Sequence, residues 1–412
     1  MTERRYWILL FVLIGVWLAA VARLTIADVW DETNGLVVFA DGSYAAITKT
    51  VLMRSVGFWR PIPTLFAALV IRALDAEVAW RLLRALNALL LLVALGRLLR
   101  TLDAWAGRDL PRNLLFAAAY LYSAGAIIAA TWFANLFDVW SLVLIACGLE
   151  LLRREKCVAA GVVFGAGFFC KETTALVFPM LLMLVALGRI RFRDALRAGI
   201  PAAIFGAVYF ALRNRLIPFG SAADTHGFAL ADFLPTLHGV LDGWWRQTFM
   251  GSGPTLFGVA CFVLSLLGFR TWRARAACLV LAFGTAVIYW QMTTVYAKGT
   301  LLHYVMFYGR LFLIPSTVTL FALALERRRW ITGALLLPLL LAAITTYMQY
   351  ERFQRSYRNL YRAAAASPKK PFIVSFPMKP LHDPRRGIEI GDDPSADWTL
   401  DPKNGKLYPV AR

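Results

Sequence analysis

Acidic residues gather at the end of the first apolar segment of the chain. Residues 8–26 are almost wholly apolar and long enough to cross a bilayer, and two arginines precede them. Three carboxylates follow directly: Asp28, Asp31 and Glu32. Charge on the side away from the positive flank is not needed for insertion, so these residues are candidates for acid/base chemistry at the outer surface. The alternative is that they cap a helix and supply its first-turn charge.

Other charged residues lie at the ends of later apolar segments. Asp138 begins one of them, and it is either a second catalytic acid or another helix-end charge. Arg60, Lys171, Lys298 and Arg310 are scarce cations on the same predicted side. Arg310 lies within an apolar run, where an unpaired charge costs at least ~2.5 kcal/mol, so we interpret it as lining a cavity. His303 and Tyr304 enter the same helix.

The composition shows what must position these residues. The 412 residues are 59% hydrophobic with a mean hydropathy of +0.60, which a soluble protein of this length cannot bury. Apolar runs recur as far as residue 347, which predicts an all-α polytopic membrane protein. The net charge of +19 does not indicate nucleic acid, because short basic clusters fall between apolar runs. By the positive-inside rule these clusters are cytoplasmic.

The alternation of basic loops and apolar runs predicts about eleven crossings in a transmembrane domain of residues 1–350. The outer loops are 28–60 and 213–252, and the apolar stretch 61–74 is short enough to lie in the outer interface. The second loop has an amphipathic segment that we expect to rest on the membrane surface, anchored by Trp244 and Trp245, with Asp242 and Arg246 facing water. Residues 351–412 form a polar extracytoplasmic tail with one short strand at 373–376.

Five motifs follow one another at the outer ends of these predicted helices. They are Asp31-Glu32, Arg60-Pro61, Trp80-Arg81-Leu82, Asn135-Leu136-Phe137-Asp138 and Lys171-Glu172-Thr173. Their order resembles that of the GT-C glycosyltransferases, and within them the protein O-mannosyltransferases and the lipid A aminoarabinose transferase. The resemblance covers residues 1–215. It implies a GT-C-type helical bundle with juxtamembrane helices on its outer face, and a polyprenyl-phosphate sugar as donor.

The resemblance also implies roles for the candidate residues. Asp31 matches the general base that takes the proton of an acceptor hydroxyl or amine, with inversion at the sugar carbon. Glu32 orients Asp31 or binds a metal, and Asp28 and Asp138 are the additional acids. Arg60, Lys171 and Arg310, with His303 and Tyr304 beside the last, are the candidate groups for holding the donor phosphate. Lys171 has a second interpretation, which is an ion pair with Glu172 or another acid.

Members of this superfamily differ in whether they need a divalent cation. Mg²⁺ or Mn²⁺ held by Glu32 and Asp138 is therefore the metal alternative, and the sequence does not decide it. The Ala-, Leu- and Arg-rich composition favours a bacterial inner membrane with the active site in the periplasm. The expected partners are the lipid bilayer, the lipid-linked donor and an acceptor of unknown kind. Two other functions remain open: a flippase or transporter of a lipid-linked sugar, and a non-catalytic membrane scaffold.

Overall fold

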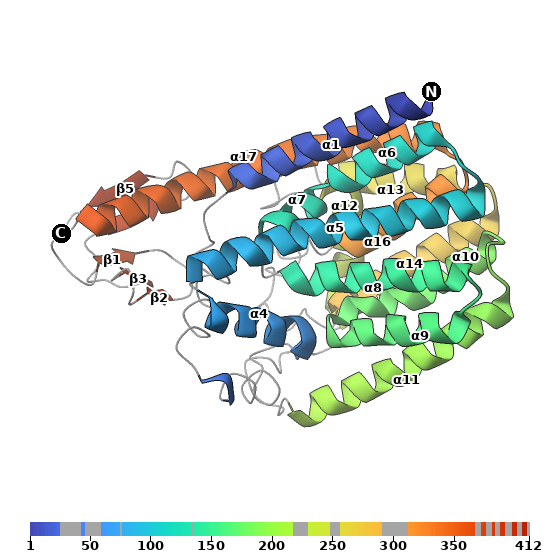
Figure 1. Ribbon diagram of the computed structural model, residues 1–412, viewed down its shortest axis with the longest axis horizontal. Helices are drawn as coiled ribbons and strands as arrows, with labels where there is room; N and C mark the ends of the chain where they lie inside the picture. Colours follow the sequence, from blue (N-terminus) through green and yellow to red (C-terminus); the bar gives the residue numbers. More distant parts are fainter. Residues whose placement is uncertain are drawn as a thin grey trace.

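The computed structural model describes residues 1–24, 43–45, 59–74, 76–132, 135–216, 230–247, 256–290 and 312–366, together with five strands between 372 and 409. Within these ranges the chain is a bundle of roughly parallel and antiparallel helices with a small sheet at one end (Figure 1). The α-helices are α1 (Glu3–Arg23), α4 (Pro61–Ala73), α5 (Ala76–Ala106), α6 (Leu110–Leu121), α7 (Ala124–Thr131), α8 (Leu136–Arg153), α9 (Cys157–Ala166), α10 (Val177–Ala186), α11 (Phe192–Leu216), α12 (Phe233–Arg246), α13 (Phe257–Gly268), α14 (Trp272–Trp290), α16 (Leu313–Leu325) and α17 (Arg329–Ala366). Short 3₁₀ helices are η2 (Gly167–Phe169), η3 (Glu172–Leu176) and η4 (Leu230–Asp232).

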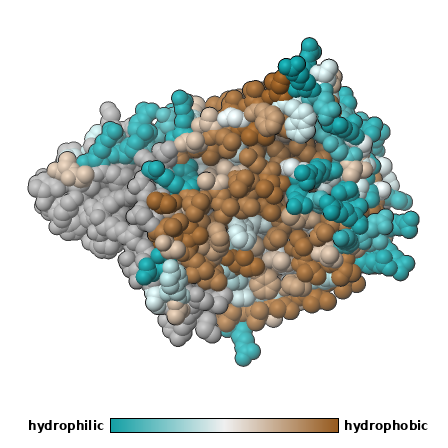
Figure 2. Space-filling model, in the orientation of Figure 1, coloured by the Kyte–Doolittle hydropathy of each residue, from teal (hydrophilic) through white to brown (hydrophobic). Residues whose placement is uncertain are grey.

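The number of spanning helices differs from the eleven expected from the sequence. Among the described residues, five helices are long and apolar enough to cross a membrane, and six if the bent pair α6–α7 counts as one span. Several expected crossings are instead shorter apolar helices of 10–17 residues, α13 and α16 among them. The polytopic character stands, since these helices are long and apolar enough to span, and the face seen in Figure 2 is apolar along the middle of the bundle and hydrophilic at its right-hand end.

Glycines set the closest helix contacts in this bundle. A Cβ on Gly161 of α9 would lie 2.2 Å from the backbone oxygen of Ala198 in α11. A Cβ on Gly258 of α13 would lie 1.6 Å from the backbone oxygen of Asp242 in α12. Apolar helices in lipid gain little from burying more apolar surface, so close packing of this kind is what holds them together.

Helix α12 corrects one expectation. Trp244 and Trp245 are fully buried instead of anchoring a surface helix, because α12 packs against α13, α14, α16 and α17. Trp244 donates a hydrogen bond to Thr319, 3.2 Å away, and packs edge-on against Phe262. Asp242 and Arg246, expected to face water, are buried and form an ion pair of 2.6 Å. The apolar face of this helix meets other helices and not the headgroups.

The basic clusters meet at one end of the bundle, which we call the basic end. Arg108 bonds Glu3 at 2.6 Å, and Arg329 donates to Asp109 at 3.0 Å. Arg189 donates to the backbone oxygens of Trp105 and Leu325. Arg97 and Arg154 both pair with Glu150. Loops far apart in the sequence therefore share one face, as the alternating topology requires.

The C-terminal segment is more ordered than its sequence suggests. Five strands, β1 (Phe372–Ser375), β2 (Leu381–Asp383), β3 (Ile388–Gly391), β4 (Trp398–Asp401) and β5 (Lys406–Pro409), form a sheet in the order β2-β3-β1-β4-β5. Strand β1 is central and pairs in parallel with β3 and β4, while the outer pairs are antiparallel. The predicted strand at 373–376 corresponds to β1, but the other four were missed, so the chain is not all-α. The sheet lies at the end opposite the basic end (Figure 1).

Candidate functional site

Four charged side chains from three parts of the chain meet near the end of the bundle that is opposite the basic end. Arg60 donates from Nε and Nη2 to Glu172 Oε2, at 3.3 and 3.1 Å. Lys171 Nζ lies 2.5 Å from Asp138 Oδ1. The guanidinium of Arg60 also lies over the Phe137 ring, 5.0 Å from its centre. We call these residues, Arg60, Asp138, Lys171 and Glu172, the charged cluster.

Helix ends place the charged cluster. Arg60 immediately precedes α4, whose first residues are Pro61-Ile62-Pro63, and proline suits the first helical turn because its nitrogen needs no partner there. Asp138 lies in the first turn of α8. Asn135, just before that helix, donates to the backbone oxygen of Ile128 at 3.0 Å and so ties α8 to α7.

A break in the helical path presents the remaining two members. The 3₁₀ turn η2 ends at Phe169 with Cys170 as its C-cap, Lys171 is extended, and η3 begins at Glu172. Gly167 allows this close approach, because a Cβ there would lie 2.7 Å from the Thr174 methyl group. The extended backbone at Lys171 lets two consecutive side chains reach different partners, Asp138 and Arg60.

Burial strengthens the electrostatic interactions within the charged cluster. The exposed side-chain fractions are 13% for Arg60, 8% for Glu172, 6% for Lys171 and 4% for Asp138. Buried charges of this kind are costly unless paired, so each pair is held in place. Burial alone would raise the pKa of Glu172, but the charges of Arg60 and Arg213 outweigh it and hold that pKa well below its ordinary range. Glu172 is therefore ionised at neutral pH.

An aromatic group supports one side of the charged cluster. Trp59 stacks on Tyr209 of α11 at 5.5 Å, and Phe169 packs edge-on against both rings. The Tyr209 hydroxyl lies within hydrogen-bond distance of Glu172 Oε1 (2.8 Å) and of the Trp59 backbone oxygen (2.7 Å). It has one proton, so it donates to one of them at a time. This contact fixes the carboxylate that holds Arg60.

Two buried hydroxyls follow the cluster in sequence. Thr173 and Thr174 are 3% and 0% exposed, and neither Oγ1 has a hydrogen-bond partner among the described residues. Buried hydroxyls are normally satisfied, so these two are notable beside charged groups. They are candidate donors to an oxygen-rich ligand.

The structure tests only part of the sequence prediction. Arg60, Asp138 and Lys171 were chosen from separate motifs, and they lie together in the charged cluster. The ion-pair interpretation of Lys171 is confirmed, with Asp138 as its partner in place of Glu172. The other candidates, Asp28, Asp31, Glu32, Lys298, His303, Tyr304 and Arg310, lie outside the described residues.

Sequence reasoning missed the aromatic support. Trp59 and Tyr209 lie in or beside apolar runs, where an aromatic residue resembles ordinary membrane packing. The available signal was the position of Trp59 directly before the Arg60-Pro61 motif. Arg81 of the Trp80-Arg81-Leu82 motif is exposed, whereas Arg84, one turn later in α5, is buried and stacks on Trp80 at 4.8 Å.

The described residues contain no group of three or more His, Cys, Asp and Glu side chains suited to a metal ion. Asp138, one of the two residues named for Mg²⁺ or Mn²⁺, is in contact with the ammonium of Lys171. Glu32, the other residue named, lies outside the described residues, so the metal alternative stays a prediction.

Comparison with known proteins assigns no family to this chain. No protein-family model matches it, and neither a curated protein nor a solved structure does. What the chain does must therefore be argued from its own residues.

Proposed function

We propose that this protein is a membrane glycosyltransferase that moves a sugar from a polyprenyl-phosphate donor to an acceptor at the non-cytoplasmic face. The observation that carries the proposal is the convergence of Arg60, Lys171, Asp138 and Glu172 at the end opposite the basic end. With the basic end taken as cytoplasmic, this cluster faces the outer side of the membrane. The finer description, a GT-C-type bundle with about eleven crossings in a bacterial inner membrane, belongs to the same proposal.

The reaction needs a base and a stabilised leaving group. Asp31 takes the proton of the acceptor hydroxyl or amine as that group attacks the anomeric carbon, and the bond from this carbon to the phosphate oxygen breaks with inversion. The polyprenyl phosphate leaves with an additional negative charge. The guanidinium of Arg60 and the ammonium of Lys171 stabilise that charge in surroundings that hold little water.

The ion pairs are compatible with this role. An arginine has five N–H donors and a lysine three, so a carboxylate partner does not use their whole capacity. Glu172 and Asp138 keep both cations charged and oriented in the absence of substrate, which lowers the cost of ordering them when a phosphate binds. The hydroxyls of Thr173 and Thr174 supply additional donors beside them.

The segment that carries the proposed base is adjacent in sequence to this cluster. Residues 25–58 join the end of α1 to Trp59, which immediately precedes Arg60 and packs on Tyr209. Asp31 and Glu32 lie in this connection.

Isolated membranes that contain the protein test the proposal with a panel of labelled polyprenyl-phosphate sugars. Wild type should transfer label, Asp31→Asn should bind donor without transferring it, and Arg60→Gln should bind donor weakly. Arg215→Gln is the matched control, because Arg215 is an exposed arginine in the last turn of α11. A transporter or scaffold would give no transfer with any donor. An Asp31→Asn variant with wild-type transfer would contradict the assignment of the base.

A further inference from the structure

The basic end holds a cavity lined by cations. Its volume is about 330 Å³, and Arg189, Arg270 and Arg327 line it together with Glu326, Trp105 and Leu325. The three arginines come from three separate connections, between α10 and α11, between α13 and α14, and between α16 and α17. Among the described residues that line the cavity, Glu326 is the one carboxylate, and it lies 3.9 Å from Arg270, so three cations face one anion and the lining carries a net positive charge.

Two of these guanidinium groups are held in place without being neutralised. Arg189 donates to the backbone oxygens of Trp105 and Leu325, at 2.7 and 2.9 Å, and its Nε is buried with no partner among the described residues. Arg327 donates from Nε to the backbone oxygen of Ala106 at 3.1 Å, and its Nη2 bonds the same oxygen. Carbonyl groups orient these cations but carry no compensating charge.

The backbone at Arg327 has a left-handed conformation. Arg327 follows Glu326, the C-cap of α16, and has a φ of 58° at a position where glycine is favoured. Its amide donates to the oxygen of Ala324, and the next amide donates to Leu323, which is the usual helix-ending pattern. An arginine in this conformation is strained relative to glycine, and here its side chain reaches across to α5.

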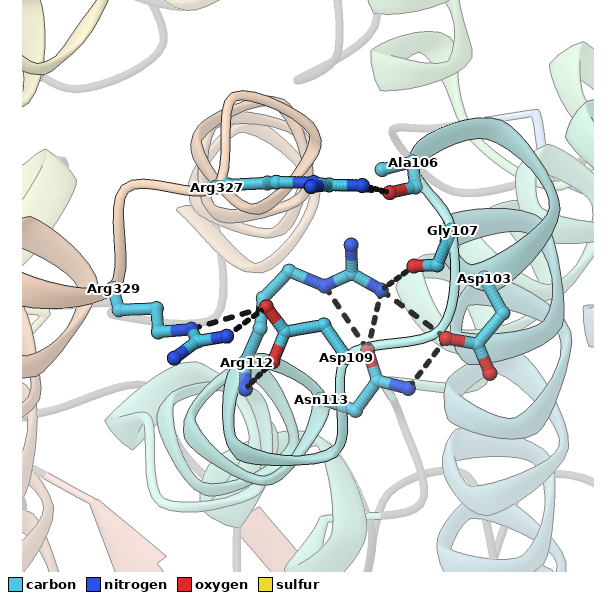
Figure 3. Close-up of polar contacts among 8 residues, drawn as sticks. All are labelled: Asp103, Ala106, Gly107, Asp109, Arg112, Asn113, Arg327 and Arg329. Carbon is cyan, nitrogen blue, oxygen red and sulfur yellow. Dashed lines mark hydrogen bonds and ion pairs between the residues drawn. The ribbon is translucent and has the colours of Figure 1, made fainter. Parts of the chain in front are cut away.

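A neighbouring arginine, Arg112, pairs with Asp103 at 3.1 Å but keeps one buried donor without a partner among the described residues. Arg112 is 2% exposed and donates through Nη2 to Asp103 and Gly107. Its Nη1 is buried with no partner in the described part of the chain, and Figure 3 shows that one guanidinium nitrogen points toward Arg327. Asp109, in the same loop, is already bonded to Arg329. Buried donors left unpaired beside other cations are typical of a site for an anion.

The geometry points to a binding site for a phosphate group in this cavity, with Arg189, Arg270 and Arg327 as its ligands. Guanidinium groups match phosphate oxygens in shape and charge. Trp105 and Leu325 give the cavity an apolar side. An anionic phospholipid headgroup and a small soluble phosphate share this chemistry. The site lies at the end opposite the charged cluster and is independent of the glycosyltransferase proposal.

Binding to the purified full-length protein in phosphatidylcholine nanodiscs distinguishes the two sources. Phosphatidylglycerol in the bilayer is one probe, and inorganic phosphate in solution is the other. A lipid site should retain phosphatidylglycerol over phosphatidylcholine in native mass spectrometry and ignore inorganic phosphate. A soluble-phosphate site should show the reverse, a shift in thermal stability with phosphate and no lipid preference. Binding of neither probe would overturn the inference.

Variants at the cavity assign the contacts. Arg270→Gln should weaken binding about tenfold, the effect expected from losing one charge-assisted hydrogen bond. Its side chain is 63% exposed, so the fold should tolerate the change. Arg273→Gln removes an exposed arginine from the first turn of α14 that does not line the cavity, and it should change affinity less than twofold.

Glu326→Gln supplies a test that misfolding cannot imitate. Removing the one carboxylate in the cavity should strengthen binding, because the lining becomes more positive. Damage to the fold would only weaken it. Equal affinity for wild type, Glu326→Gln and Arg270→Gln would place the phosphate elsewhere.

Discussion

Lys171 and Asp138 are 33 residues apart in the sequence, and their side chains form an ion pair of 2.5 Å with less than a tenth of either exposed. The pair joins the start of α8 to the break between α9 and α10. It lies beside a second buried pair, Arg60–Glu172. The two pairs hold together helix ends that lie far apart in the sequence. They contribute to the stability of the fold and to the proposed chemistry.

Breaking one buried pair should destabilise the protein markedly. Lys171→Met leaves the Asp138 carboxylate buried without its cation, so we expect a loss of about 3–5 kcal/mol in unfolding free energy. The double variant Lys171→Met with Asp138→Leu should recover much of that loss, because no charge is then left alone. Unfolding in detergent, followed by tryptophan fluorescence, measures both.

The exposed pair Arg355–Glu351 of α17 is the control for this experiment, with 62% and 46% of the side chains exposed. Glu351→Gln should change stability by less than about 1 kcal/mol. If Lys171→Met costs no more than this control, the buried pair is not holding the helix ends.

Packing of α9 on α11 should depend on a single glycine. Gly161→Ala places a methyl group 2.2 Å from the Ala198 backbone oxygen, and a backbone atom cannot move aside cheaply. We expect a loss of about 1–3 kcal/mol. Gly96→Ala in α5 meets nothing within 4 Å and should be neutral or slightly stabilising. Thermal unfolding of the two variants side by side measures the difference, and equal melting temperatures would show that the helices are not packed this closely.

The sequence predicted three of the four members of the charged cluster because scarce charges in an apolar chain stand out. Arg60, Asp138 and Lys171 each interrupt or flank an apolar run, and such charges must find partners. Tyr209 and Trp59 could not be found this way, since an aromatic residue in a membrane helix gives the same pattern whether it packs on lipid or supports a carboxylate.

Other differences between the sequence prediction and the structure arise for the same reason: a local pattern does not show which partner a residue or segment contacts. The apolar face of α12 indicates burial but not what buries it, so Asp242 and Arg246 were assigned to water although they pair inside the bundle. Helix length was a poor guide to the number of crossings, because short apolar helices such as α9 and α10 lie inside the bundle although neither is long enough to span a membrane alone. In the tail, strands of three or four residues give too short a pattern to be recognised without their pairing partners.

Acidic pH should weaken the basic end through Asp109. Burial raises the pKa of this carboxyl, but the bonds from Arg329 and from the Arg112 amide outweigh burial and hold the pKa below its ordinary value. Because the folded pKa is depressed, the stabilisation is complete above the unfolded pKa of about 3.9 and is lost as pH falls through the folded pKa. Melting temperatures between pH 6 and pH 3 measure this loss.

Asp109→Asn isolates the charge in that experiment. Asparagine caps a helix as well as aspartate, so the bond from the Arg112 amide at the start of α6 can persist. The variant should be less stable than wild type at pH 6, and the gap should close toward pH 3. A gap that stays constant over this range would assign the effect to the cap and not to the charge.

Tyr209→Phe should separate positioning from stability at the charged cluster. The variant removes the hydroxyl that lies 2.8 Å from Glu172 but keeps the ring that stacks on Trp59. Tyr122→Phe removes a comparable hydroxyl, which donates to the Leu13 backbone oxygen at 3.0 Å, and it is the matched control. Each change should cost about 1 kcal/mol of stability. Only Tyr209→Phe removes a contact of Glu172, which lets Glu172 and its partner Arg60 shift. Under the proposed function, only this variant should therefore weaken donor binding, by about tenfold. Equal donor affinity in the two variants would show that the Tyr209 hydroxyl supports the fold and not the site.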